Sequence, residues 1–306
     1  MKKFAFVFFI CLWATTFSMA QKTMLLSYNM PVGYSFKLTQ VSKMDVVQNM
    51  AGMEIKTLQN TEGTNTLKVV ESSNDAIKFE VTYASFKTSV QNMQVNQTID
   101  AANPQDATSK FLAALLGKPF FMSIDKQGKI ISTEGLEKAV EDAKASMGNL
   151  EPADAAAVEQ MVNSMGNTEN FNKNMQVVFL IYGKEATGKN ATWSYETESP
   201  APLNLAQKHN VKVLKLGKKG GAFTVDVNMM PVSTPDYVLG PGNMEIKTEI
   251  TGKNICNVVT TKTGLLSTMT TNAVLNGTIS IKANAQIPQD MVIPCNYTIS
   301  NSFTIK

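Results

Sequence analysis

Two flanks of the chain alternate apolar and polar residues with a period of two. The alternation is regular over residues 34–38 and 77–83 in the first flank, and over 223–227 and 297–305 in the second. A strand with one apolar and one polar face is typical of an antiparallel sheet that is buried on one side only. We therefore predict β structure in two halves of the chain, residues 21–100 and 190–306.

The centre of the chain, residues 103–182, has an apolar period near 3.6, which predicts helices. Asn103 and Thr133 are predicted N-caps, Pro152 opens a third segment, and a glycine follows each of the three. Residues 171–182 fit both a fourth helix and a buried strand, and we favour the helix. The three clearer helices are predicted over 104–116, 134–147 and 152–165.

Together these patterns predict an α+β fold in a single β-rich domain. Curved antiparallel β-sheets form the two β-rich halves, and the central helical segment covers them. A short hairpin over residues 120–132 separates the first two helices, because Asp125 to Gly128 suit a tight turn.

Residues 1–20 are typical of a secretory signal peptide. Two lysines precede an apolar stretch that is shorter than a usual membrane span, and a small-x-small motif ends at Ala20. We predict cleavage between Ala20 and Gln21, with export to the periplasm or the extracellular space. The alternative is an uncleaved N-terminal anchor. No later apolar run is long enough for a transmembrane helix.

Cleavage of the signal peptide would leave two of the three cysteines. Cys11 lies in the signal peptide, which leaves Cys256 and Cys295 in the exported chain. An even pair in an oxidising compartment predicts a disulfide between them. The alternative is two buried free thiols, because cysteine is among the most often buried residues.

The charge balance excludes several classes of partner. The chain has a formal net charge of +3, and its basic residues are all lysines. Arginine is the usual residue for bidentate contacts to phosphate and to guanine. We therefore expect no nucleic acid partner and no phosphate-bearing cofactor.

One sequence motif has the spacing of a nucleotide-binding loop, but the residues around it do not fit such a loop. Residues 183–190 have the G-x-x-x-x-G-K spacing of a P-loop, whose backbone N–H groups hold phosphates. Asn190 occupies the position of the serine or threonine that would bind magnesium, and the residues that follow have the pattern of a strand. We interpret the segment as a turn.

The remaining candidates for chemistry also point away from an enzyme. His209 is the only histidine, so it cannot form a two-histidine metal site, and we interpret it as an exposed loop residue. Glu137, Glu141 and Asp142 alternate with lysines on one predicted helix, which indicates a solvated face. We predict no catalytic residue, no metal and no cofactor.

Methionine is the one compositional excess, with 18 residues in the chain. Flexible thioethers suit adaptable apolar pockets, although filling of gaps in the core is the more common role. If the protein has an apolar ligand, we expect inward residues of the helices to contact it. These are Phe111, Leu115, Leu136, Val140 and Met161.

Several short segments resemble an uncharacterised family of exported Bacteroidota proteins, a domain of unknown function. They are the signal peptide, Gly33-Tyr34-Ser35-Phe36, the hairpin FFMSIDKQGKIISTEGL, Gly188 to Trp193, and T-K-T-G-L at 261–265. The resemblance implies export and a β-rich fold with central helices, and it implies no activity. More distantly, the layout is similar to LolA-type lipoprotein carriers, in which an incomplete barrel holds acyl chains under helices.

Our prediction is therefore an exported, non-enzymatic protein. Its ligand would be hydrophobic, a lipid or an acyl chain held between sheet and helices. The alternative is a structural or interaction module of the envelope, whose partner is another protein and which has no small-molecule ligand.

Overall fold

The computed structural model describes residues 23–50, 52–199, 203, 205–232, 238–239, 245–284 and 287–306. The predicted signal peptide and its cleavage site at Ala20 and Gln21 lie outside these residues. None of the helices within them has the length and apolar character that crossing a membrane requires.

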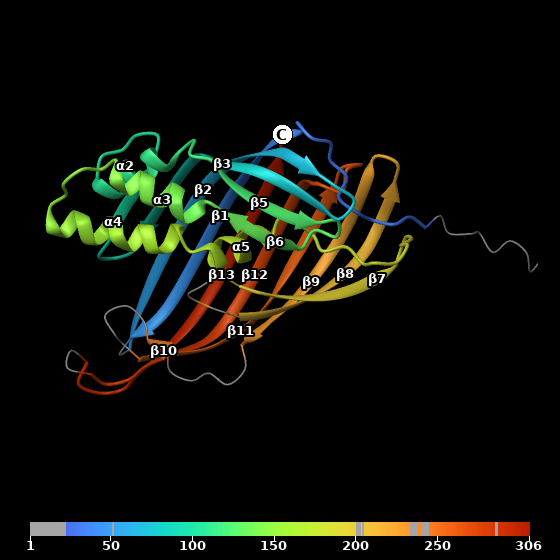
Figure 1. Ribbon diagram of the computed structural model, residues 1–306. Coiled ribbons are helices and arrows are strands. Elements are labelled where there is room, and N and C mark those ends of the chain that lie inside the picture. Colours follow the sequence, from blue (N-terminus) through green and yellow to red (C-terminus); the bar gives the residue numbers. More distant parts are fainter. Residues whose placement is uncertain are drawn as a thin grey trace, which may run out of the picture.

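Strands dominate the described chain (Figure 1). They are β1 Ser35–Met50, β2 Met53–Ser72, β3 Ala76–Gln91, β4 Asn96–Asp100, β5 Phe120–Asp125, β6 Ile130–Glu134, β7 Thr192–Glu198, β8 Leu205–Gly217, β9 Gly220–Pro231, β10 Val238–Leu239, β11 Glu245–Thr260, β12 Leu266–Ile281 and β13 Met291–Ile305.

All of these strands belong to one antiparallel sheet. The sheet has 13 strands in the order β6-β5-β3-β2-β1-β13-β12-β11-β9-β8-β7, with β4 beside β3 and β10 beside β11. The first and last strands of the chain pair with each other, from Leu38 opposite Ile305 to Gln48 opposite Cys295. The sheet does not close, because β6 and β7 have no strand beyond them among the described residues.

The predicted α+β arrangement of two β-rich halves under helices is therefore wrong. The β1–β13 pairing merges both flanks into a single sheet, and the described helices are few and short. Local alternation shows which face of a strand is buried, but it carries no information about which distant strand lies beside it.

The helices of the described chain are α2 Ala107–Leu115, α3 Leu136–Ala145, α4 Pro152–Met165 and α5 Thr168–Gln176. Asp106, not Asn103, is the N-cap of α2, since its side chain accepts a hydrogen bond from the Ser109 N–H at 2.8 Å. Gly135, at φ 81°, precedes α3, and the predicted cap Thr133 lies in β6 instead. Only α4 has the predicted bounds.

The helices occupy two places on the sheet. Helices α2, α3 and α4 pack on one another at one end of the molecule, whereas α5 lies inside the curve of the sheet (Figure 1). The predicted fourth helix over 171–182 is right only as far as Gln176, and the apolar residues after it are neither helix nor strand.

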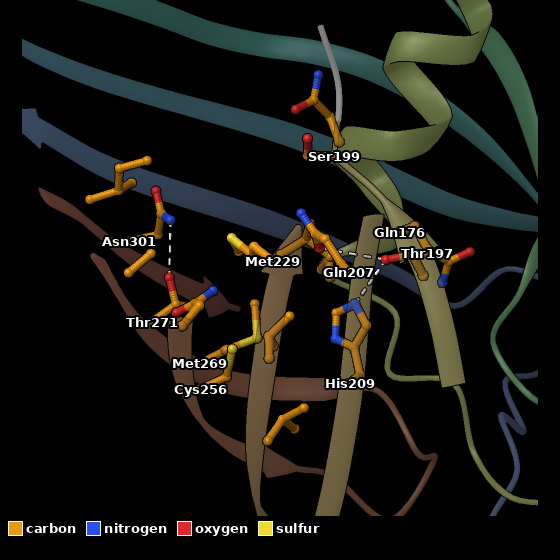
Figure 2. A pocket seen from close by; sticks show the side chains of 18 of the residues that line it. Gln176, Thr197, Ser199, Gln207, His209, Met229, Cys256, Met269, Thr271 and Asn301 are labelled. Carbon is orange, nitrogen blue, oxygen red and sulfur yellow. Dashed lines mark hydrogen bonds between the residues drawn. The ribbon is translucent and has the colours of Figure 1, made fainter. Parts of the chain in front are cut away.

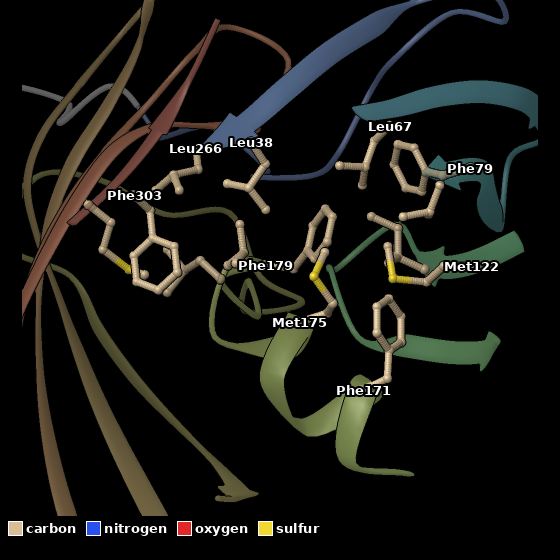
Figure 3. Close-up of a cluster of buried hydrophobic side chains, with 14 of the residues drawn as sticks. Leu38, Leu67, Phe79, Met122, Phe171, Met175, Phe179, Leu266 and Phe303 are labelled. Carbon is tan, nitrogen blue, oxygen red and sulfur yellow. The ribbon is translucent and has the colours of Figure 1, made fainter. Parts of the chain in front are cut away.

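The inner, concave face of the sheet holds the core. On β12 the buried residues alternate with exposed ones, so that Met269, Thr271, Ala273 and Leu275 all face inward. Figure 3 shows Met175 and Phe179, from α5 and the residues after it, among inward side chains such as Leu38, Leu67 and Phe79. The rings of Phe120 and Phe171 pack edge to face with centroids 5.1 Å apart.

Candidate functional site

A cavity of about 310 Å³ lies on the concave face, between a roof and the strands of the second flank together with β1. The roof consists of residues 174–180, which we call the roof segment; it contains the end of α5 and the irregular residues after it. The walls come from β1, β7, β8, β9, β11, β12 and β13 (Figure 2).

The strands supply the cavity lining by simple alternation. On β8 the residues Leu205, Gln207, His209, Val211 and Val213 face inward, and their neighbours face solvent. Most inward positions of the second flank are apolar, as a buried face requires. A minority of the lining residues on the strands and just after β7 are polar and uncharged, and these give the cavity its chemical character: Gln40, Ser42, Thr197, Ser199, Gln207, His209, Asn254, Thr271 and Asn301.

His209 is a buried residue of this lining, so its predicted place in an exposed loop is wrong. Its side chain stacks on Tyr195 with ring centroids 4.4 Å apart, and its Nε2 shares a hydrogen bond of 2.8 Å with the Thr197 Oγ1. Burial lowers the pKa of His209 to about 4, because the imidazolium form would lose its hydration. The imidazole is therefore neutral at neutral pH.

On the opposite wall, Thr271 and Asn301 have hydrogen-bond partners, whereas the side-chain oxygen of Asn254 has none among the described residues. Asn301 Nδ2 donates a hydrogen bond of 3.0 Å to Thr271 Oγ1, across the β12–β13 pair. The side-chain oxygen of Asn254 is buried and has no hydrogen-bond partner within the described part of the chain. A buried amide oxygen without a partner is rare in proteins.

The roof segment is fixed to the sheet on one side by Gln176. Its Nε2 donates to the carbonyls of Gly128 and Phe179, both at 2.9 Å, and its Oε1 accepts from the Ile130 N–H at 2.9 Å. Gly128 has φ 101° and leaves no room for a side chain against the ring of Tyr28. The roof is therefore anchored to the β5–β6 hairpin.

A salt bridge ties the same helix to the other wall. Lys173 of α5 pairs with Glu198 at the end of β7 at 2.9 Å, and with Glu169 one helical turn earlier at 2.7 Å. Helix α5 thus bridges two strands, β6 and β7, that form the opposite edges of the sheet.

The five predicted ligand-lining residues do not line this cavity. Phe111, Leu115, Leu136 and Val140 are at most 1% exposed and belong to the hydrophobic core, and Met161 packs against it. The helical patterns correctly marked inward faces, but those faces are filled by neighbouring side chains. Of the methionines, Met229 and Met269 do line the cavity.

The predicted disulfide between Cys256 and Cys295 is also wrong, since both residues are buried free thiols. Cys256 on β11 is opposite Thr271 of β12, and Cys295 on β13 is opposite Gly277 of the same strand. This register separates the two cysteines by roughly 20 Å along the strands, at about 3.3 Å per residue. A disulfide needs Cα atoms within about 7 Å.

We expect two titratable thiols in residues 21–306 once this part of the chain is denatured. In the native state Cys256 should react very slowly, because burial raises its pKa to about 12 and leaves little thiolate. Ellman's reagent measures both quantities, before and after denaturation and without any reductant. Absence of thiol in the denatured, unreduced chain would instead indicate the disulfide.

The motif at residues 183–190 forms a loop, as interpreted from the sequence. Thr187 makes an isolated β-bridge with Met24, and Gly183 packs against the ring of Trp193. Asn190, at φ 68°, has a left-handed backbone and leads directly to β7. The segment therefore has no helix N-terminus to receive a phosphate.

Comparisons with known proteins give one family match. A model described as "Family of unknown function (DUF6263)" matches residues 74–266, which include the roof segment, His209 and Asn254. Among curated proteins, none matches the sequence significantly.

Three solved structures are similar at low identity. A lipovitellin structure, entitled "Lipid-protein interactions in lipovitellin", has a TM-score of 0.46 and 9% identity over 91% of this chain; the match covers 25% of the lipovitellin chain. An outer membrane channel from Pseudomonas putida F1 has a TM-score of 0.23 and 9% identity, with 91% of this chain and 97% of the channel covered. Omp33, an outer membrane protein of Acinetobacter baumannii, has a TM-score of 0.14 and 8% identity, with coverage of 92% and 99%.

Proposed function

Because the chain belongs to DUF6263, a family of unknown function, we propose a function from the cavity itself: an exported, non-enzymatic protein that binds a hydrophobic ligand. The ligand lies on the concave face of the sheet, beneath the roof segment. An acyl or similar chain is the chemical class that fits the lining.

The observation that carries this proposal is an unfilled, partly open space between the concave face of the sheet and the roof segment. Protein interiors are close-packed, and voids much larger than a water molecule are uncommon. A cavity of about 310 Å³ is instead at the lower end of the range for small-molecule sites. It has room for on the order of ten heavy atoms, at about 30 Å³ each.

The anchoring of the roof supports the same proposal. Two hydrogen bonds of Gln176, to Gly128 and Ile130, and the salt bridge of Lys173 with Glu198 hold α5 and the roof segment above the strands. Such a roof keeps the space from collapsing when it is empty. A site that is formed before binding loses less free energy in ordering itself around a ligand.

The chemistry of the lining supports binding over catalysis. The side-chain partner of His209 is the hydroxyl of Thr197, and no carboxylate of the described residues lines the cavity to orient the imidazole as in a triad. Within the described residues there is also no cluster of His, Cys, Asp and Glu that would hold a metal ion.

Extraction of the protein purified from its source tests the proposal. We expect native mass spectrometry to detect a bound apolar molecule at one per chain, and an emptied sample to bind decan-1-ol saturably in isothermal titration. Repeated recovery of empty protein that also fails to bind decan-1-ol would contradict the proposal. Crosslinking to a stoichiometric protein partner in that case would favour the alternative, an envelope interaction module.

A further inference from the structure

Among the described residues that line the cavity, none has a charged side chain. None of the residues around the cavity is a lysine, an aspartate or a glutamate, although the chain has 28 basic and 25 acidic residues. A charge taken out of water without a partner pays a large desolvation cost. A ligand whose carboxylate, phosphate or ammonium enters this space would therefore have no compensating group.

Uncharged polar groups nevertheless reach into the centre of the cavity. Asn254 on β11 lies between Val227 of β9 and Ala273 of β12, both of which also line the cavity. In the strand order one polar pair lies on each side of β11, Thr271 with Asn301 on β12 and β13, and Thr197 with His209 on β7 and β8; Figure 2 shows both pairs. A purely apolar ligand would leave this belt of polar groups in contact with hydrocarbon.

Asn254 differs from its neighbours because its buried oxygen has no partner. The pairs beside it are satisfied within the protein, whereas the Asn254 Oδ1 finds no donor among the described residues. Folding rarely leaves such an atom unpaired, and a ligand is one of the groups that can satisfy it. An O–H or N–H donor of the ligand would do so.

We infer that the ligand is a neutral amphiphile, such as a long-chain alcohol or primary amide, whose hydrogen-bond donor binds the Asn254 Oδ1 while its chain contacts the apolar walls. This inference rests on the proposed function, since it names the class of ligand for the same cavity. The polar side chains of Asn254, Thr271 and Thr197 determine where along the cavity the polar head group of the ligand lies. The absence of charged residues then discriminates against fatty acid anions and phospholipid phosphates.

A panel of ligands that share a ten-carbon chain tests the inference on the exported chain. Isothermal titration at pH 8, below micelle-forming concentrations, compares decan-1-ol, decanamide, 1-methoxydecane, decanoate and decyltrimethylammonium. We expect the alcohol and the amide to bind most tightly. The ether accepts but cannot donate, so it should bind about five- to tenfold more weakly, as for one lost hydrogen bond. The two ions should bind at least about 100-fold more weakly.

A variant of Asn254 tests whether the ligand donates its hydrogen bond to this residue. We expect Asn254→Leu to weaken decan-1-ol binding by about five- to tenfold and to leave 1-methoxydecane binding unchanged. Ile255→Ala is the matched control, because the neighbouring side chain is on the convex face and 52% exposed. If Asn254→Leu fails to fold, the ligand panel on the unmodified chain still decides the question.

The outcomes separate this inference from the proposed function. Binding of every ligand with similar affinity, or tightest binding of decanoate, would overturn the neutral-amphiphile inference and leave hydrophobic binding intact. Equal binding of ether and alcohol would overturn the donor contact to Asn254. Binding of none of the five would contradict both proposals.

Discussion

Replacement of Ala273 by phenylalanine is expected to weaken decan-1-ol binding by at least about 100-fold. Ala273 is 3% exposed and lines the cavity from β12, beside Asn254. The added ring would occupy more than half of a space with room for on the order of ten heavy atoms. Each ligand atom that the ring displaces costs about 0.3 kcal/mol or more of binding free energy. Forcing the rest of the ligand into the space beside the ring costs about another 1–3 kcal/mol.

The matched control for this variant is its neighbour in sequence. Val274→Phe adds a ring to the convex face, where Val274 is 54% exposed, and should leave binding unchanged. Both variants should melt within a few degrees of the unmodified chain, because one fills an existing space and the other points to solvent. Isothermal titration and thermal unfolding measure the two quantities. Full-strength binding by Ala273→Phe would show that the ligand lies elsewhere.

Acidification from pH 7 to pH 4 is expected to destabilise the fold through His209. Its pKa is about 4 in the folded chain, against the ordinary value of 6.5 that applies when the chain is unfolded. The unfolded chain therefore takes up the proton first, so stability is full above about pH 6.5 and falls as the pH drops toward 4. The loss approaches about 3 kcal/mol at the acid end of this window.

The single histidine makes this effect easy to isolate. His209→Gln keeps a neutral hydrogen-bonding side chain beside Thr197 and removes the titrating group. Urea unfolding at pH 7, 5.5 and 4 should show a steeper decline for the unmodified chain than for the variant, and the remaining slope belongs to the carboxylates. Parallel declines would contradict the prediction, because they would show that His209 has the same pKa in the folded and the unfolded chain.

The sequence predicted the strands and turns better than their assembly. The hairpin between β5 and β6 forms as expected, because Gly128 and the polar residues before it specify its turn locally. Helix α4 also begins and ends where the pattern indicates. The segment after Gln176 was misjudged, since its apolar residues fit several structures and tertiary packing decided among them.

The candidate site was missed although part of its signal is present in the sequence. On β8 the alternation of Leu205, Val211 and Val213 with lysines assigns Gln207 and His209 to the buried face. Asn254 has the same relation to Cys256 and Val258 on β11. Polar residues at inward positions of an apolar face indicate a site, and strand periodicity alone would have located them.

The sequence by itself determined that both flanks are β structure, which side of the alternating strands is buried, and where the β5–β6 turn lies. These properties depend on neighbouring residues and on a backbone period of two, so they can be read along the chain. Only the tertiary structure decided that β1 joins β13, that Cys256 and Cys295 lie far apart, and that residues 174–180 cover a space they do not fill. Register between distant strands and the volume left between packed side chains are properties of the assembled molecule, because they arise from residues that meet only after folding.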